Sequence, residues 1–235
     1  MSKQESINQY GEKLAIDGYI VIENYFTPKT CDELKLAIDK TIEGGKFIES
    51  KNMDIKETVS KKEPVLSRRA GSYDDGMLDL FNIDFIDPKI GDFMKDPFLK
   101  DIITIAAGSK FSPMRINAYI NRGVTNPRGY HADTYTGSFK TFVYLTDVPD
   151  NSFGPYSFIK GSHKVSPTKR KTSKLVNRLR GKPSTEAVFY DKSQATIFTA
   201  PKGTLIISNQ AGLHSGIPQE KNRERMLITT SYTPS

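Results

Sequence analysis

The second half of the chain alternates short apolar runs with turns, a pattern typical of a β-sheet core. From Ser112 onward, strand signals are separated by clusters of turn-forming residues. Residues 203–209 are apolar and β-branched, and they end in a short turn at residues 210–212. A charged turn at residues 219–224 then leads into a second such run, residues 225–232. We therefore expect most of this half to lie in β-strands.

Helical patterns precede the β-rich half. Residues 6–16, 28–42 and 97–107 have helix-like spacing, and Thr27 can cap the second helix ahead of Pro28. The expected fold class is therefore mainly β with flanking helices (α+β). With 235 residues, 37% of them apolar, the chain is long enough for one sizeable core. Because no linker divides it, we expect a single domain over residues 1–235.

His131 and Asp133 form a His-x-Asp pair, which is the most informative feature of the chain, although this spacing by itself often arises by chance. A strand places residues i and i+2 on one face, so this pair can offer an imidazole nitrogen and a carboxylate oxygen to one ion. His214 follows the 203–209 strand and can complete a set of two histidines and one carboxylate. Three such ligands on one side of an octahedral ion leave positions open, as in non-haem Fe(II) oxygenases.

Arg225 opens the strand that returns eleven residues after His214. From there its guanidinium could enter the same cavity and bind a carboxylate through two hydrogen bonds. A dicarboxylate cosubstrate needs such a partner. The sequence thus groups Arg225 with the three candidate metal ligands.

The chain resembles the phytanoyl-CoA dioxygenase-like family of Fe(II)/2-oxoglutarate-dependent oxygenases. The resemblance runs from about Ala15 to Tyr232 and includes residues 17–26, which look like the family's opening strand. It rests on Gly-Tyr-His-Ala-Asp at residues 129–133, on Gly-Pro-Tyr-Ser-Phe-Ile-Lys-Gly-Ser-His-Lys at 154–164, and on His214 with Arg225. The chain has Tyr130 where many relatives have Trp, and Ser215 is shifted one position from the family's serine.

The resemblance implies a double-stranded β-helix (jelly roll, cupin-like) and a set of site roles. His131, Asp133 and His214 would hold Fe(II), with Arg225 on the distal carboxylate of 2-oxoglutarate. Further cosubstrate contacts are expected from Asn117, Ser215 and Thr229. Tyr130 would form an aromatic wall against the substrate, and His163 a structural hydrogen bond.

The expected reaction is hydroxylation of an aliphatic carbon by molecular oxygen, with release of succinate and CO2 and with ascorbate as a possible reductant. A carboxylate at Asp133 argues against halogenation, in which the family has a small residue there. Desaturation, cyclisation and epimerisation use the same ligands and stay open. Two other classes also stay open, a catalytically silent jelly-roll ligand-binding protein and a zinc-dependent hydrolase.

Two variable segments are expected near the site. Residues 47–76 are rich in Lys, Glu and Ser and are typical of a mobile loop or lid. Residues 165–186 form a basic insertion, with seven basic and no acidic residues between positions 169 and 182. This segment is either a solvated surface or a means of attracting a small anionic, lipid- or sugar-derived substrate. Candidate contacts are Arg68, Arg69, Lys169, Arg170 and Lys171.

Composition limits the remaining function classes. The chain has no apolar run near eighteen residues and a polar start, so neither a membrane span nor a signal peptide is indicated, and we expect a cytoplasmic enzyme. Cys31 is the only cysteine, which excludes an intrachain disulfide. The pI near 9.3 permits nucleic-acid binding, but the basic run lacks interleaved aromatics and no nucleic-acid-binding signature is present. The oligomeric state is not indicated.

Overall fold

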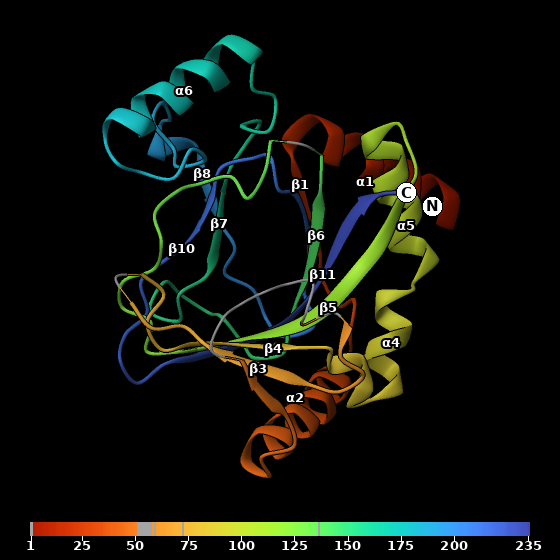
Figure 1. Cartoon of the computed structure of the whole chain (residues 1–235). Helices are drawn as coiled ribbons and strands as arrows, with labels where there is room; N and C mark the ends of the chain where they lie inside the picture. The colour runs from red at the N-terminus through yellow and green to blue at the C-terminus, as the bar shows by residue number, and fades with distance from the viewer. Residues whose placement is uncertain (1, 51–57, 59, 72, 136) are drawn as a thin grey trace.

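The computed structural model describes residues 2–50, 58, 60–71, 73–135 and 137–235, and two β-sheets form its centre (Figure 1). The strands of the main sheet are β1 (Tyr19–Ile22), β2 (Ile48–Ser50), β3 (Val65–Arg68), β4 (Met77–Phe81), β5 (Phe111–Arg122), β6 (Phe139–Tyr144), β9 (Leu205–Asn209) and β11 (Glu224–Pro234). They pair in the order β1-β9-β6-β11-β5-β4-β3-β2. The minor sheet pairs β10 (His214–Gly216), β7 (Tyr156–Ile159) and β8 (Ala195–Ile197). This arrangement is jelly-roll-like and confirms the expected fold class.

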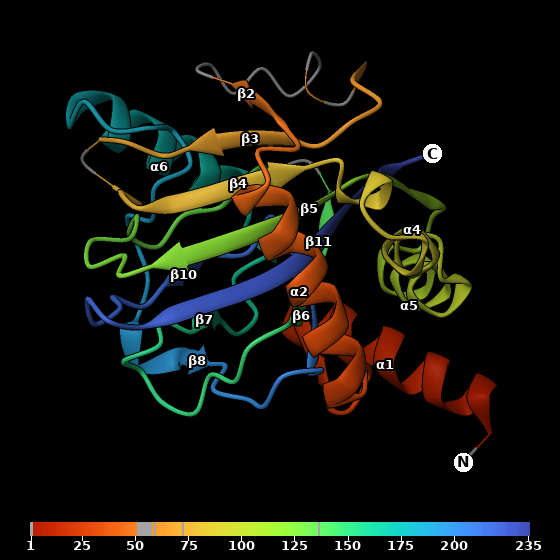
Figure 2. The ribbon, with the colours of Figure 1, turned by 90° about the horizontal axis from the view of Figure 1, so that it is seen from below.

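Helices flank the sheets. They are α1 (Lys3–Asp17), α2 (Pro28–Glu43), α4 (Pro88–Met94), α5 (Pro97–Ala107) and α6 (Pro167–Leu179), with short 3-10 turns η1 (Ile83–Phe85) and η2 (Lys192–Gln194). Thr27 caps α2 by accepting the Thr30 N–H, and Pro28 occupies the first turn, where its missing N–H costs nothing. Figure 2 shows α2 crossing one face of the main sheet. The helices expected at 6–16, 28–42 and 97–107 are therefore confirmed, the first two extended by one to three residues at one or both ends.

Side-chain alternation along the strands divides the interior into two cores. On β11, Met226 and Ile228 pack with the helices, whereas Leu227 joins a second cluster between the sheets. That second cluster includes Tyr156 and Phe158 from the minor sheet. The space between the sheets is thus filled with aromatic side chains at one level, and the site described below lies on this inner side.

The segment 47–76 departs from the expected loop. β2 and β3 lie within it and extend the main sheet, with β2 parallel to β3 and β3 antiparallel to β4. Leu66 is fully buried, which explains why a segment rich in polar residues still forms a strand. Residues 51–57, 59 and 72 of the expected lid lie outside the described residues.

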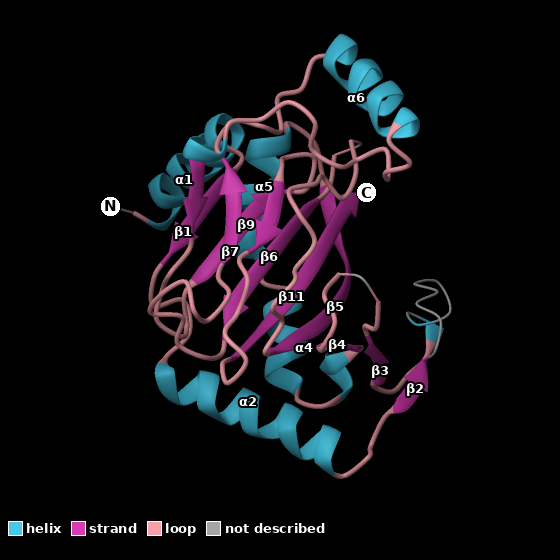
Figure 3. Cartoon of the chain, turned by 90° about the vertical axis from the view of Figure 1, so that its left-hand side faces the viewer, coloured by secondary structure: helices cyan, strands magenta, loops and turns pink. Residues whose placement is uncertain are grey.

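The basic insertion 165–186 contains α6, which begins after the capping side chain of Ser166. The helix lies away from the other helices (Figures 1 and 3). Among its residues only Ser173 and Asn177 are buried. None of the described helices is both long and apolar enough to cross a membrane.

Candidate functional site

The backbone brings His131 and His214 side by side. Each residue's N–H donates to the carbonyl oxygen of the other, at 3.0 and 2.9 Å, so the two form an antiparallel bridge. Directly paired residues point to the same side of a sheet, and the ring centroids are 4.6 Å apart. Asp133 is attached to the turn after β9, because its N–H donates to the carbonyl of Gln210 at 3.0 Å. A local strand pairing therefore collects three residues that are far apart in sequence.

The ligand atoms of His131, Asp133 and His214 all lie within 4.8 Å of one another. Asp133 Oδ1 is 3.6 Å from the Nε2 atom of each histidine. The Nδ1 atoms face the carbonyl oxygens of Gly129 and Gly212, at 2.7 and 3.0 Å. A carbonyl can only accept, so Nδ1 carries the proton in both rings and Nε2 presents its lone pair to the centre. This donor set suits a divalent metal ion.

Lys140 on β6 holds the other oxygen of the carboxylate. Its Nζ lies 2.6 Å from Asp133 Oδ2. Burial by itself would raise the pKa of Asp133, but Lys140 and the two histidines outweigh it and hold that pKa well below its usual range. Burial lowers the pKa of His214 despite the nearby carboxylate. The site therefore presents an ionised carboxylate and a neutral His214 at neutral pH, which are the protonation states that a metal requires.

A cavity of about 280 Å³ opens beside these three side chains. The triad, Arg225 and Lys140 line it together with Arg69, Asp74, Met77, Tyr119, Asn121, Val124, Pro127, Arg128, Phe142, Tyr156, Gln210, Ser215, Gly216, Ile217 and Leu227. The cavity thus combines aromatic walls with charged groups. The structure therefore groups Arg225 with the triad in one cavity, as the sequence predicts.

Arg225 is buried, with a relative exposure of 6%. Its Nη1 donates to the carbonyl of Gly154, while Nε has no hydrogen-bond partner among the described residues. Burial lowers the pKa of Arg225. A buried guanidinium with an unpaired N–H destabilises the fold unless an anion binds it, so Arg225 is suited to bind a carboxylate that enters the cavity.

Asn117 and Thr229 face each other across β5 and β11. Both are buried, and neither the Asn117 amide nor the Thr229 hydroxyl has a partner among the described residues. They do not line the cavity but share a strand face with Tyr119 and Leu227, which do. Ser215 lines the cavity, and its hydroxyl already lies 2.8 Å from the carbonyl of Arg128.

The remaining predicted contacts are spread over several surfaces. Arg69 lines the cavity in ion pairs with Asp79 and Asp74, whereas Arg68 pairs with Glu49 on the exposed surface. Tyr130 points away from the cavity, since it precedes His131 in an extended segment, and its hydroxyl contacts Ser157.

The basic residues of α6 lie outside this cavity. Lys169 lines a separate cavity, Arg170 lies over the Tyr135 ring at 5.3 Å, and Lys171 is exposed. His163 donates through Nε2 to the carbonyl of Ala15 at 3.1 Å, which bears out the expected structural role.

Several cavity residues were not anticipated from the sequence. Lys140 is the single charged residue of strand β6, whose other residues are uncharged and buried, and such a charge is rarely buried without a partner. That anomaly could have identified it. Arg128, which pairs with Glu186 at 2.6 Å, had no comparable sequence signal because its partner is 58 residues away.

No protein-family model matches the chain, and no curated protein matches its sequence. Solved structures share its fold. The non-haem alpha-ketoglutarate-dependent epimerase SnoN of nogalamycin biosynthesis has a TM-score of 0.66 at 12% identity, covering 98% of this chain and 83% of SnoN. HygX from Streptomyces hygroscopicus, with nickel and 2-oxoglutarate bound, has a TM-score of 0.65 at 12% identity, covering 97% and 87%.

The carbocyclase SnoK, also alpha-ketoglutarate-dependent and from nogalamycin biosynthesis, has a TM-score of 0.66 at 13% identity, covering 99% of this chain and 85% of SnoK. At this level of identity the likeness shows a shared fold. Membership of the phytanoyl-CoA dioxygenase-like family stays a prediction. The chain nevertheless shares its fold with SnoN and SnoK, which are non-haem alpha-ketoglutarate-dependent enzymes.

Proposed function

We propose that the chain is an Fe(II)- and 2-oxoglutarate-dependent oxygenase that acts on a small molecule. The observation that carries this proposal is the convergence of two histidine Nε2 atoms and one carboxylate oxygen in the cavity that also contains Arg225. Two histidines and a carboxylate with open positions suit non-haem Fe(II). The fold neighbours support the same proposal, since HygX has been solved with iron bound and with nickel and 2-oxoglutarate bound.

His131, Asp133 and His214 would hold the iron. The pairing of Lys140 with Asp133 Oδ2 leaves Oδ1 as the oxygen that faces both histidines. Binding through Oδ1 alone would leave coordination positions for other ligands. Bound iron would supply the binding and activation of molecular oxygen.

Arg225 would bind the distal carboxylate of 2-oxoglutarate with its unpaired Nε–H. A charged guanidinium in a buried cavity gives strong, directional hydrogen bonds to a carboxylate. Asn117 and Thr229, both without partners among the described residues, are the next candidates for polar contacts from beneath the cavity. Ser215 supplies a hydroxyl at the cavity wall.

The outcome that we propose is hydroxylation of an aliphatic carbon, with succinate and CO2 as coproducts. Aromatic walls at Tyr119, Phe142 and Tyr156 would orient the substrate and exclude water. SnoN is an epimerase and SnoK a carbocyclase, which favours a second candidate within the same chemistry, removal of a substrate hydrogen without transfer of a hydroxyl group. Product analysis separates the two outcomes.

Substrate charge remains a prediction. Among the cations that line the cavity, Arg69, Arg128 and Lys140 each have a carboxylate partner, and Arg225 is assigned to the cosubstrate. The cavity thus has little unbalanced positive charge. An anionic group on a lipid- or sugar-derived substrate would have to bind the α6 side of the molecule.

The test is succinate formation by protein reconstituted anaerobically with Fe(II) and 2-oxoglutarate and then exposed to oxygen. We expect slow succinate release that is lost in His131→Ala. Titration calorimetry with Mn(II) and 2-oxoglutarate accompanies it, because binding does not require turnover. A protein that binds the metal but not 2-oxoglutarate would overturn the proposal and favour a silent binding module or a metal-dependent hydrolase.

A further inference from the structure

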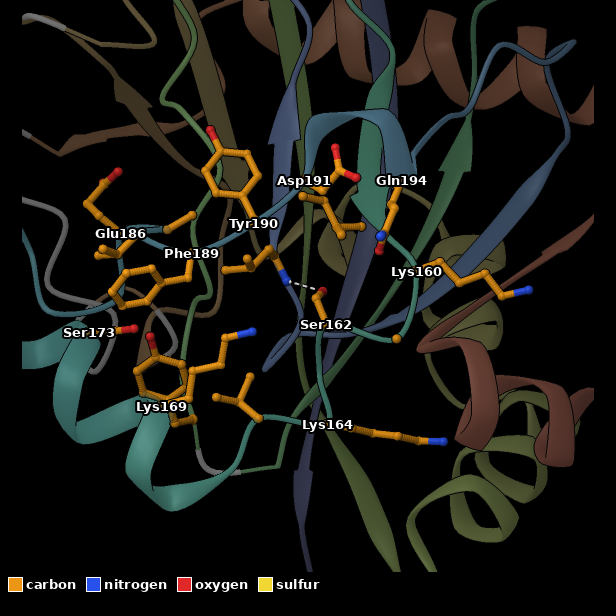
Figure 4. A pocket seen from close by; sticks show the side chains of 17 residues that line it. Lys160, Ser162, Lys164, Lys169, Ser173, Glu186, Phe189, Tyr190, Asp191 and Gln194 are labelled. Atoms are coloured by element: carbon orange, nitrogen blue, oxygen red, sulfur yellow. Dashed lines mark hydrogen bonds between the residues drawn. The ribbon is translucent and has the colours of Figure 1, made fainter.

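A second cavity, of about 460 Å³, lies beside the minor sheet (Figure 4). Its walls come from the loop that follows β7, from α6 and from residues 186–194. It shares no lining residue with the metal cavity. Leu213 lines the second cavity and His214 the first, and consecutive residues of an extended chain point to opposite sides. The second cavity therefore lies behind the segment that bears the metal ligand.

Apolar and aromatic side chains form much of its wall. Ile159 and Leu213 form part of the wall on the sheet side, with Val188 and Phe189 from the facing segment. Phe189 remains 48% exposed, which is unusual for a large ring within a concave surface. The cavity can therefore bury the apolar body of a ligand.

The charged groups around it are unequally paired. Glu186 forms an ion pair with Arg128, and the Asp191 carboxylate accepts the Ser193 N–H. Lys169 has no ion-pair partner within 4 Å among the described residues. Figure 4 shows its ammonium directed into the cavity, whereas Lys160 and Lys164 extend away from it. Among the described lysines that line the cavity, Lys169 is thus the one that points inward and has no ion-pair partner.

The helix that carries Lys169 is fixed to the opposite wall. Asn177 is fully buried on α6, and its amide donates to the carbonyl of Glu186 at 2.8 Å. The main-chain carbonyl of Asn177 accepts the N–H of Lys182 at 2.9 Å. The bond to Glu186 joins α6 to the 186–194 segment, and Lys169 projects from the same helix at the cavity wall.

We propose that this second cavity binds an organic anion, a carboxylate, sulfonate or phosphate attached to an aromatic or otherwise apolar body. Lys169 pairs with the anionic group, and Phe189 with its neighbours covers the body. The inference goes beyond the proposed oxygenase and does not depend on it, because the two cavities share no residue. Besides the adjacent residues Leu213 and His214, the Arg128–Glu186 ion pair connects the two cavities, since each partner lines one of them.

The probe is anilinonaphthalene sulfonate, a sulfonate on a fused aromatic body, titrated by fluorescence at low salt. Lys169→Ala should weaken binding about fivefold, the effect of losing one partly exposed ion pair. Lys171→Ala removes the same charge from an exposed site on the same helix and should change binding less than about twofold. Phe189→Ala and the exposed Leu175→Ala form a second matched pair, in which only the first weakens binding.

The titration is repeated with saturating Mn(II) and 2-oxoglutarate. Unchanged dye affinity supports a separate site, whereas displacement of the dye by these ligands places it in the metal cavity and overturns the proposal. Equal dye affinities of Lys169→Ala and Lys171→Ala, or of Phe189→Ala and Leu175→Ala, would overturn it as well. Circular dichroism of each variant establishes that the fold is intact.

Discussion

At the scale of single residues, the site depends on two cations in different situations. Lys140 is neutralised by the carboxylate it holds, whereas Arg225 has an N–H without a partner among the described residues. The first therefore orients a ligand of the protein, and the second is prepared for a ligand from solution. Each role predicts a different response to substitution.

Arg225→Lys should weaken the binding of 2-oxoglutarate without affecting the binding of the metal. Lysine keeps the charge but cannot form the two parallel hydrogen bonds, so we expect the KM for 2-oxoglutarate to rise about tenfold or more. Metal affinity should not change, because Arg225 is not a ligand. A variant that loses Mn(II) binding together with 2-oxoglutarate binding would contradict this division of roles.

Lys140→Met should destabilise the metal-free protein by roughly 2 kcal/mol, because it leaves the Asp133 carboxylate without its charge partner. Added Mn(II) replaces the missing positive charge, so the metal-induced rise in Tm should be larger than in the parent protein. Lys89→Met is the control, since its pair with Glu33 is exposed and far from the site. Equal metal-induced shifts in both variants would argue against a link between Lys140 and the metal site.

At the scale of elements, two glycines occupy equivalent places, each two residues before one of the candidate metal-binding histidines. The carbonyls of Gly129 and Gly212 accept the Nδ1–H of His131 and His214. Their surroundings differ: a Cβ on Gly212 would lie 2.1 Å from the Phe158 ring, whereas one on Gly129 would meet nothing within 4 Å. The two positions therefore form a matched pair for mutation.

Gly212→Ala should cost about 2 kcal/mol of stability, since the fully buried Phe158 has little room to move. We also expect weaker Mn(II) binding, because the same shift displaces the strand that carries His214. Gly129→Ala should remain within about 0.5 kcal/mol of the parent. Chemical denaturation measures the first effect and calorimetry the second, and similar losses in both variants would contradict the packing argument.

Local patterns predicted some elements well and missed others. Residues 28–42 carry a cap, a proline and apolar spacing, so the helix found at Pro28–Glu43 needs no distant contact to explain it. β2 and β3 were missed because their strand character comes from pairing, of β3 with β4 and of β2 with β3, and not from their own composition. The three candidate ligands were found from type and spacing, whereas Lys140 and Arg128 are defined by partners on other segments.

At the scale of the whole molecule, we expect the metal to stabilise the fold first, and 2-oxoglutarate to stabilise it further only after the metal has bound. Mn(II) at a hundred times its Kd should raise Tm by about 5 °C or more, because it binds only the folded arrangement of three distant residues. 2-Oxoglutarate should add a further rise only when the metal is present, and a chelator should remove both. A rise caused by 2-oxoglutarate alone would show that its main contacts are with the protein and not with the metal.

The two imidazole rings are held by main-chain carbonyls rather than by side chains. A main-chain acceptor is present whatever residue occupies the position, so no ordinary substitution can delete it. Apart from Gly212, where Phe158 leaves no room for a side chain, random mutagenesis should therefore find few inactivating changes among residues that orient the rings, and many among the ligands themselves. The tautomers of His131 and His214 are thus set by the course of the main chain, and substitutions that preserve this course leave them unchanged.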